Sequence, residues 1–198
     1  MASGDPVRHR GVRVATVTRQ MNDETRDALT QVRFPRIAAR DLEGRERVLP
    51  EAFRGVFNLV IVAFRREQQA MADTWVSWFE TVADKYPELR CYEIPVLSRR
   101  WSPARFFIDG GMARAVREKE ARRRTLTIYT DVRRVTEALA IDDTRTVTAL
   151  LVDAMGSVFW RTTGSITAGA RSSVVAKLRE SARVDGAEEA GGAAAGDR

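Results

Sequence analysis

The sequence is poor in the two side chains that most often carry metal and redox chemistry. Its 198 residues include one cysteine, Cys91, and one histidine, His9. A single cysteine excludes an internal disulfide and any Cys-x-x-Cys redox or zinc motif, and it is typical of a reducing compartment. A single histidine in a polar segment argues against a histidine metal site and against Ser-His-Asp or Cys-His catalysis. We therefore expect neither a metal nor a cofactor.

Long apolar runs are also missing. No stretch approaches the roughly 18 apolar residues that indicate a membrane-spanning helix, and the N-terminus lacks the apolar core of a signal peptide. The sequence thus predicts no transmembrane segment and a cytoplasmic location. The formal net charge is +6, and the excess comes from arginine rather than lysine. Such a balance is compatible with an anionic partner, but charges of both signs interleave along the chain, which favours solvated basic faces.

Residues 56–64 form a near-continuous apolar run rich in β-branched and aromatic side chains. The run is too short for a buried helix, so it predicts a strand covered on both faces at the centre of a sheet. Apolar residues at helical spacing over 71–86 predict an amphipathic helix directly after it. Ligands of open α/β sheets bind at such strand–helix junctions. The junction carries Arg65, Arg66 and Gln68, which we predict as a binding face for an anion or for a partner's carboxylate.

The rest of the chain supplies further strands and helices around this unit. A helical crossover predicts that the strand over 56–64 and the strand after the helix are parallel. Residues 1–33 predict a mobile arm and the Ala/Gly/Glu-rich residues 184–198 a disordered tail, which leaves one domain over 34–183. The other predicted elements are a hairpin over 34–50, a strand over 89–97, a helix beginning at Ser102, a basic helix over 112–124, a strand over 125–129, a short helix capped by Asp131, strands over 146–152 and 158–160, and a helix capped by Thr167.

The order of these elements and two motifs resemble the thioredoxin-like superfamily, in its redoxin and peroxiredoxin branch. The motifs are a strand-Asp-x-x-Gly-turn-strand pattern over 151–158 and a strand with a following short helix over 125–131. The resemblance extends from about Phe34 to Leu178. It implies an α/β fold of three layers, in which a mixed sheet of about five strands is flanked by helices and carries a helical insertion.

Both halves of the thioredoxin redox site are missing. In active members of the superfamily, the turn after the central strand carries a cysteine that is activated at the helix N-terminus. Here that turn reads Arg-Arg-Glu-Gln-Gln over 65–69. The cis-proline that faces the cysteine is replaced by Val147-Thr148. Cys91 lies inside the second predicted strand, and we interpret it as a small core residue.

A looser similarity connects the chain with a cysteine-free branch that includes the mitochondrial ATP synthase assembly factors. It implies a role in binding or assembly rather than in catalysis. Trp101 lies in the predicted insertion and completes the predicted binding face, because a large aromatic side chain can anchor a partner. The similarity rests on Asp73-x-Trp75, on Tyr92-Glu93-Ile94-Pro95 before Trp101, and on Leu151-Val152-Asp153 with Gly156-Ser157-Val158-Phe159-Trp160 and Gly164.

A basic stretch follows Trp101 and is the candidate contact for nucleic acid or acidic lipid. No aromatic residues interleave with its charges, which argues against nucleic acid as the partner, at least as a bound single strand. Trp75, Trp78 and Phe79 stand at helical spacing and are predicted to pack in the core. The members of the basic patch are Arg114, Arg117, Arg122, Arg123 and Arg124.

Three functions are compatible with the sequence. The first is a non-catalytic thioredoxin-fold protein that binds another protein, as an assembly or chaperone-like factor, through the former active-site face. The second is an enzyme similar to a thiol peroxidase or oxidoreductase that uses Cys91 or a borrowed thiol. The third is a basic nucleic-acid-binding module. We favour the first, because the fold is kept while the redox site is emptied.

Overall fold

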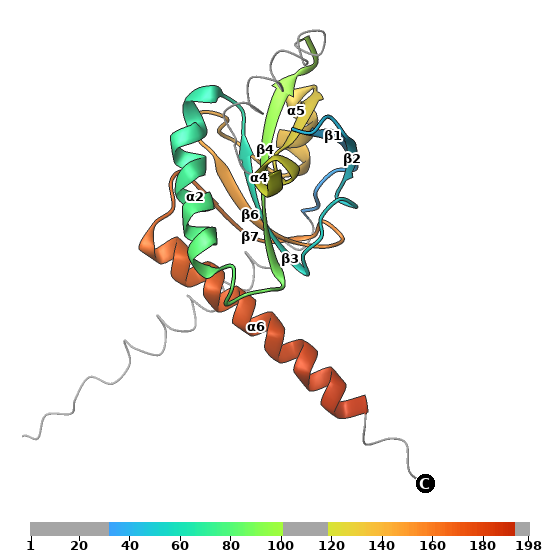
Figure 1. Cartoon of the computed structure of the whole chain (residues 1–198), viewed down its shortest axis with the longest axis vertical. Coiled ribbons are helices and arrows are strands. Elements are labelled where there is room, and N and C mark those ends of the chain that lie inside the picture. Colours follow the sequence, from blue (N-terminus) through green and yellow to red (C-terminus); the bar gives the residue numbers. More distant parts are fainter. Residues whose placement is uncertain (1–31, 101–118, 193–198) are drawn as a thin grey trace, which may run out of the picture.

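The computed structural model describes residues 32–100 and 119–192, and these residues build one seven-stranded mixed sheet with helices on both faces (Figure 1). The strand order is β2-β1-β5-β4-β3-β6-β7. The strands are β1 (Ile37–Asp41), β2 (Glu46–Leu49), β3 (Phe57–Ala63), β4 (Leu89–Ser98), β5 (Leu126–Thr130), β6 (Thr148–Asp153) and β7 (Val158–Thr163). The helices are η1 (Arg66–Gln68), α2 (Gln69–Val82), α4 (Lys119–Arg124), α5 (Val132–Ala138) and α6 (Ala168–Gly192).

The α/β fold class is confirmed, but the expected count of about five strands is wrong. Strands β5-β4-β3-β6-β7 form the expected sheet, and the β1–β2 hairpin extends it beyond β5. β1 pairs antiparallel with β5, with Arg40 opposite Thr127 and Asp41 opposite Leu126. Without the hairpin, β5 would be an edge strand with unpaired backbone groups. The hairpin therefore belongs to the sheet and is not a separate element.

β3 is an interior strand, at the centre of the five strands β5-β4-β3-β6-β7, as the apolar run predicts. All seven of its residues are buried. It pairs parallel with β4 from Phe57–Leu89 to Ala63–Pro95 and antiparallel with β6. A strand covered on both faces cannot alternate apolar and polar side chains, which explains the continuous run.

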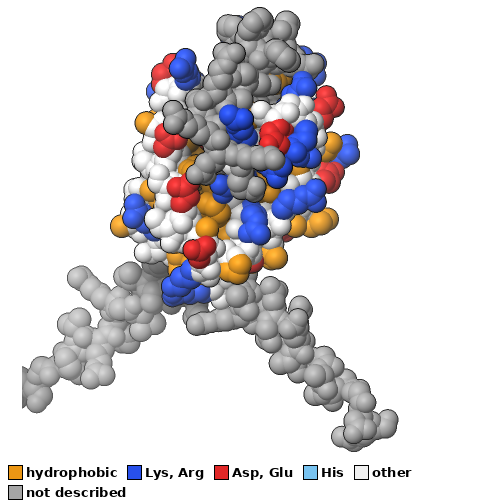
Figure 2. Space-filling view, viewed as in Figure 1, with side chains coloured by type: hydrophobic (Ala, Val, Ile, Leu, Met, Phe, Trp, Pro, Cys, Tyr) orange, Lys and Arg blue, Asp and Glu red, His pale blue; other side chains and the backbone are white. Residues whose placement is uncertain are grey.

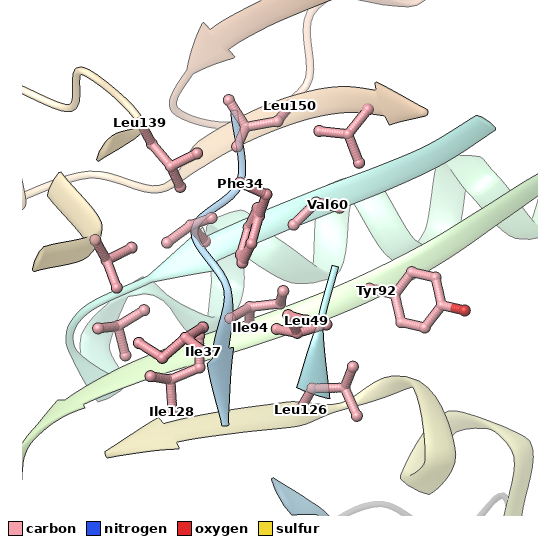
Figure 3. Packing of buried hydrophobic residues seen from close by; sticks show 14 of the residues in the cluster. Phe34, Ile37, Leu49, Val60, Tyr92, Ile94, Leu126, Ile128, Leu139 and Leu150 are labelled. Atoms are coloured by element: carbon pink, nitrogen blue, oxygen red, sulfur yellow. The ribbon is translucent and has the colours of Figure 1, made fainter. Parts of the chain in front are cut away.

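Two apolar layers cover the two faces of the sheet. Figure 3 shows part of the first layer, in which Phe34 and Ile37 lie across the strands beside Val60, Ile94 and Ile128. Helix α5 contributes Val135, and Leu139 follows directly after it; both are fully buried. The second layer lies between the sheet and the helices α2 and α6. Its members include Leu59, Ile61, Trp75, Trp78, Phe79, Cys91, Leu151, Trp160, Val174 and Leu178.

The predicted domain limits fall close to the ends of the described residues. The boundary predicted at residue 184 lies inside α6, which continues to Gly192. At the other end, Arg33 forms an antiparallel bridge with Ser157, and the Val158 N–H donates to the Val32 carbonyl over 3.0 Å. None of the described helices is long and apolar enough to cross a membrane.

Candidate functional site

By the resemblance of the sequence, the turn after β3 corresponds to the turn that carries the redox cysteine in thioredoxins, and Gln68 holds this turn together. The Gln68 Oε1 accepts hydrogen bonds from the Phe64 N–H at 2.7 Å and the Arg65 N–H at 3.3 Å. Its Nε2 donates to the Thr144 carbonyl at 2.9 Å. Thr144 lies in the loop before β6, where thioredoxins carry their cis-proline. A buried amide therefore joins the two loops that form a redox centre elsewhere.

The structure places Gln68 in the interior and not at the surface with the other members of the predicted binding face. Its side chain is 1% exposed, whereas Arg65 and Arg66 are exposed. An amide that reaches back three residues to the N-cap backbone is a pattern of helix starts. That pattern is present at Arg65 and Gln68, and it is the signal in the sequence that indicates a structural role for Gln68.

Replacing Gln68 by alanine is expected to lower the free energy of unfolding by about 1.5 to 2 kcal/mol, because three backbone groups lose their buried partner. Urea unfolding measures this change. Glu67→Ala is the control, since Glu67 is the exposed neighbour of Gln68 and the loss of its side chain should cost less than about 0.5 kcal/mol. Equal effects of the two variants would contradict the role of Gln68.

The exposed side chains of this region belong to a larger arginine-rich edge. β3, β4 and β5 are parallel, so their carboxyl ends meet at one edge of the sheet, at the top of Figure 1. β6 is antiparallel to β3 and begins at the same edge. Adjacent strands lie about 5 Å apart, so these four strand ends span about 15 Å. We call this the carboxyl edge, and its arginines are Arg65 and Arg66 after β3, Arg99 and Arg100 after β4, Arg133 and Arg134 after β5, and Arg145 before β6.

Positive charge outweighs negative charge at the carboxyl edge. The acidic residues in the six positions next to each of these strand ends are Glu67, Asp131, Asp142 and Asp143, so seven arginines stand against four carboxylates there. Within the described residues, Arg65, Arg66 and Arg99 form no ion pair. Guanidinium groups in this state can bind a carboxylate or a phosphate through paired N–H donors.

One arginine of the carboxyl edge is neutralised within the chain. Arg145 donates from Nε and Nη2 to the two carboxylate oxygens of Asp143, both at 3.0 Å. Side-chain and backbone hydrogen bonds from Arg145 hold the pKa of Asp143 below its ordinary value, and the charge of Arg65 adds to this effect. Asp143 is therefore ionised at neutral pH and opposes part of the positive charge beside the turn.

The basic patch predicted from the sequence divides into separate contacts. Arg114 and Arg117 lie outside the described residues, as does Trp101. Among the others, Arg123 pairs with Glu43 at 3.2 Å, and Arg124 stacks over the Phe79 ring at 5.4 Å. These contacts hold the end of α4 against the β1–β2 turn and against α2. Figure 2 shows further basic side chains on the side of the molecule that carries β1 and β2.

Cys91 lies in the core, as the sequence predicts. Its side chain is 3% exposed and belongs to the apolar layer under α2. Burial raises the pKa of Cys91 to about 12, although the nearby Arg124 lowers it in part. The thiol is opposite Leu59 on β3, four residues before the end of that strand, which corresponds to about 13 Å along the strand. Cys91 therefore stays protonated at neutral pH and away from the carboxyl edge.

Glu93 is the other ionisable group of β4 with a shifted pKa. Burial raises the pKa of Glu93, and the charge of Asp73 adds to this, while a hydrogen bond with Gln69 opposes it. No group of three histidine, cysteine, aspartate or glutamate side chains that could hold a metal ion occurs within residues 32–100 and 119–192. Glu93 therefore belongs to no candidate metal site in that part of the chain.

Comparison with known proteins establishes the fold. No protein-family model matches the chain, and no curated protein matches it in sequence. Yeast Sco1 with copper bound is similar in structure, with a TM-score of 0.53 and 13% identity over 76% of this chain and 94% of Sco1. A candidate electron transfer protein from Aquifex aeolicus VF5 has a TM-score of 0.54 and 11% identity over 75% of this chain and 96% of its own. The chain therefore has a thioredoxin-like fold.

A third similar structure agrees with this assignment. A domain of a candidate thiol-disulfide isomerase from Cytophaga hutchinsonii ATCC 33406 has a TM-score of 0.50 and 11% identity over 78% of this chain and 96% of its own. At such identities the likeness is one of fold. The residues of the carboxyl edge must therefore be interpreted from their own chemistry.

Sequence reasoning found Arg65 and Arg66 but did not assign Arg99, Arg134 and Arg145 to the same face. The signal was present, because each of the three parallel strands is followed within four residues by an Arg-Arg pair. It becomes visible only when the strand directions are known, since parallel strands bring their carboxyl ends together.

Proposed function

We propose that this chain is a non-catalytic thioredoxin-fold protein whose carboxyl edge binds an acidic segment of another protein. One observation carries the proposal: arginine pairs follow β3, β4 and β5 at the edge where redoxins place their reactive cysteine. Closely spaced arginines match carboxylates in charge and in hydrogen-bond geometry. They also increase the rate of encounter with an acidic partner.

The position and pKa of the single cysteine, Cys91, support a binding function over thiol chemistry. The turn over 65–69 holds no cysteine, and the pKa of Cys91 is raised to about 12 by burial. A reducing compartment such as the cytoplasm suits this single thiol. The looser resemblance of sequence motifs to ATP synthase assembly factors leads us to propose complex assembly as the process that this binding serves.

Site-specific photo-crosslinking in the native cell tests the proposal. A photoreactive side chain at Glu67, on the carboxyl edge, is expected to give protein adducts that the same group at Ser172 on α6 does not give. Replacing both Arg65 and Arg66 by alanine should weaken the interaction at least about tenfold, because each charged hydrogen bond contributes on the order of 1.5 kcal/mol or more. The adducts should decrease accordingly.

Three results would overturn this function. Adducts that persist unchanged in the double variant would show that the arginines do not bind the partner. Turnover of peroxide or disulfide that is lost in Cys91→Ser would support the enzyme instead. If the adducts contained nucleic acid rather than protein, the third function would take its place.

A further inference from the structure

A recess lies between the ends of β4 and β5 on the carboxyl edge. Its volume is about 280 Å³, and it is lined by Ser98, Arg99, Thr130, Asp131 and Arg134. Ser98 and Thr130 face each other as the last residue pair of the two parallel strands. Two hydroxyl side chains therefore lie together with two guanidinium groups in a space large enough for a small acidic group and its hydration.

The fold holds the polar groups of this recess in place. Arg134 donates from Nη2 to the Arg36 carbonyl at 3.0 Å, which anchors one side of its guanidinium. The Asp131 Oδ1 accepts the Arg133 N–H at 3.1 Å, so this carboxylate has a structural role in capping α5. Thr130 is 3% exposed. Groups that are fixed before binding lose little conformational entropy when a ligand arrives.

The charges in the recess decide which anion it suits. Arg99 and Arg134 contribute two positive charges and Asp131 one negative charge, which leaves one positive charge. A carboxylate carries one negative charge and completes the balance. A phosphate monoester carries between about 1.5 and 2 negative charges at neutral pH and would also face the carboxylate of Asp131. The charge balance therefore favours a carboxylate.

We infer that this recess binds a carboxylate side chain of the acidic segment that the carboxyl edge recognises. The inference rests on the proposed function and assigns its anchor point. Arg99 supplies an exposed guanidinium and Arg134 an anchored one, and Ser98 and Thr130 supply hydroxyl donors. Arg65 and Arg66 then contact further acidic groups of the same segment.

Binding of a labelled oligo-glutamate peptide to the full chain tests the inference, with oligo-glutamine as the neutral counterpart. Fluorescence anisotropy is expected to show about tenfold weaker binding for Arg99→Gln and for Arg134→Gln. Arg133→Gln removes an arginine of the carboxyl edge that does not line the recess, and it should weaken binding less than either of these variants. Arg179→Gln is the matched control, because Arg179 is an exposed arginine on α6 and is not part of the carboxyl edge. Its effect should stay below about twofold. Arg99 has no structural hydrogen bond among the described residues, so its variant remains informative even if Arg134→Gln unfolds.

A second measurement identifies the anion and the side chains that bind it. Titration of the labelled chain with acetate should shift the arginine Nε–H signals of Arg99 and Arg134 more than that of Arg133. Suppose that peptide binding requires Arg65 and Arg66, but that replacing Arg99 or Arg134 weakens it no more than replacing Arg133. That result would overturn the recess as the anchor point and keep the proposed function. If inorganic phosphate competed with the peptide more strongly than acetate does, the assignment of a carboxylate as the bound anion would be overturned. No affinity for the acidic peptide would overturn both proposals.

Discussion

Replacing Trp75 by alanine is expected to lower the free energy of unfolding by about 3 to 5 kcal/mol, the range of large core truncations. Trp75 is fully buried on the inner face of α2. Its ring lies 6.0 Å from the ring of Trp160 in an edge-to-face arrangement. Its Nε1 donates to the Gly164 carbonyl at 2.8 Å, which ties α2 to the segment after β7. Alanine removes the packing, the aromatic pair and this hydrogen bond together.

Urea unfolding followed by circular dichroism measures this loss. Ser77→Ala is the control, because Ser77 lies on the exposed face of the same helix and should change the free energy by less than about 0.5 kcal/mol. Trp75→Phe keeps an aromatic ring but lacks the N–H, so we expect a loss between those of the other two variants. A loss below about 1 kcal/mol for Trp75→Ala would mean that α2 does not depend on this contact.

The parts of the fold that the sequence predicts are those with a local signature. The continuous apolar run gives β3, and helical spacing places Trp75 in the core. The β6–β7 turn is also local: the Asp153 Oδ1 accepts the N–H groups of Met155 and Ser157, both at 2.8 Å. Gly156 has φ +84° there, a conformation that favours glycine. These features need no knowledge of distant residues.

The features that the sequence did not predict depend on contacts between distant segments. Gln68 and Thr144 are 76 positions apart, and nothing in the local pattern at Gln68 names its partner. The pairing of Arg40 with Thr127 on β5 is similarly remote. Periodicity reports which side chains are buried, but not which loops or edges meet. The carboxyl edge is hidden for the same reason, since its arginines come from three separate connections, between β3 and β4, β4 and β5, and β5 and β6.

Asp41 is the second residue whose loss should cost much stability. Its side chain is fully buried, and its Oδ1 accepts the N–H groups of Glu43 and Arg45 at 3.0 and 2.9 Å. Its Oδ2 accepts from Arg45 Nε at 2.8 Å and from Arg47 Nη2 at 3.1 Å. Asp41→Asn keeps the shape but turns an amide N–H toward the arginines. We expect a loss of about 2 to 3 kcal/mol, because the two arginines are partly exposed and can turn to water.

The matched control is Asp143→Asn. Asp143 also accepts two hydrogen bonds from an arginine side chain, but that arginine is largely exposed. Water screens and replaces such a pair, so the control should change stability far less than Asp41→Asn. Equal losses in the two variants, measured by urea unfolding at neutral pH, would show that burial of Asp41 adds nothing.

The pH dependence distinguishes an ionic role of Asp41 from a packing role. Burial alone would raise the pKa of Asp41, but hydrogen bonds from the Arg45 backbone and side chain outweigh it and hold the pKa below its ordinary value of 3.8. A carboxyl group whose pKa is lower in the folded state stabilises the fold above its unfolded pKa, and this contribution is lost as the pH falls through the folded value. The difference in free energy of unfolding between the wild type and Asp41→Asn should therefore be constant near neutral pH and shrink below about pH 4. If this difference in free energy of unfolding were unchanged in that acidic range, the stability loss of Asp41→Asn would come from the shape of the hairpin turn. The carboxylate charge would then not be what holds Arg45 and Arg47.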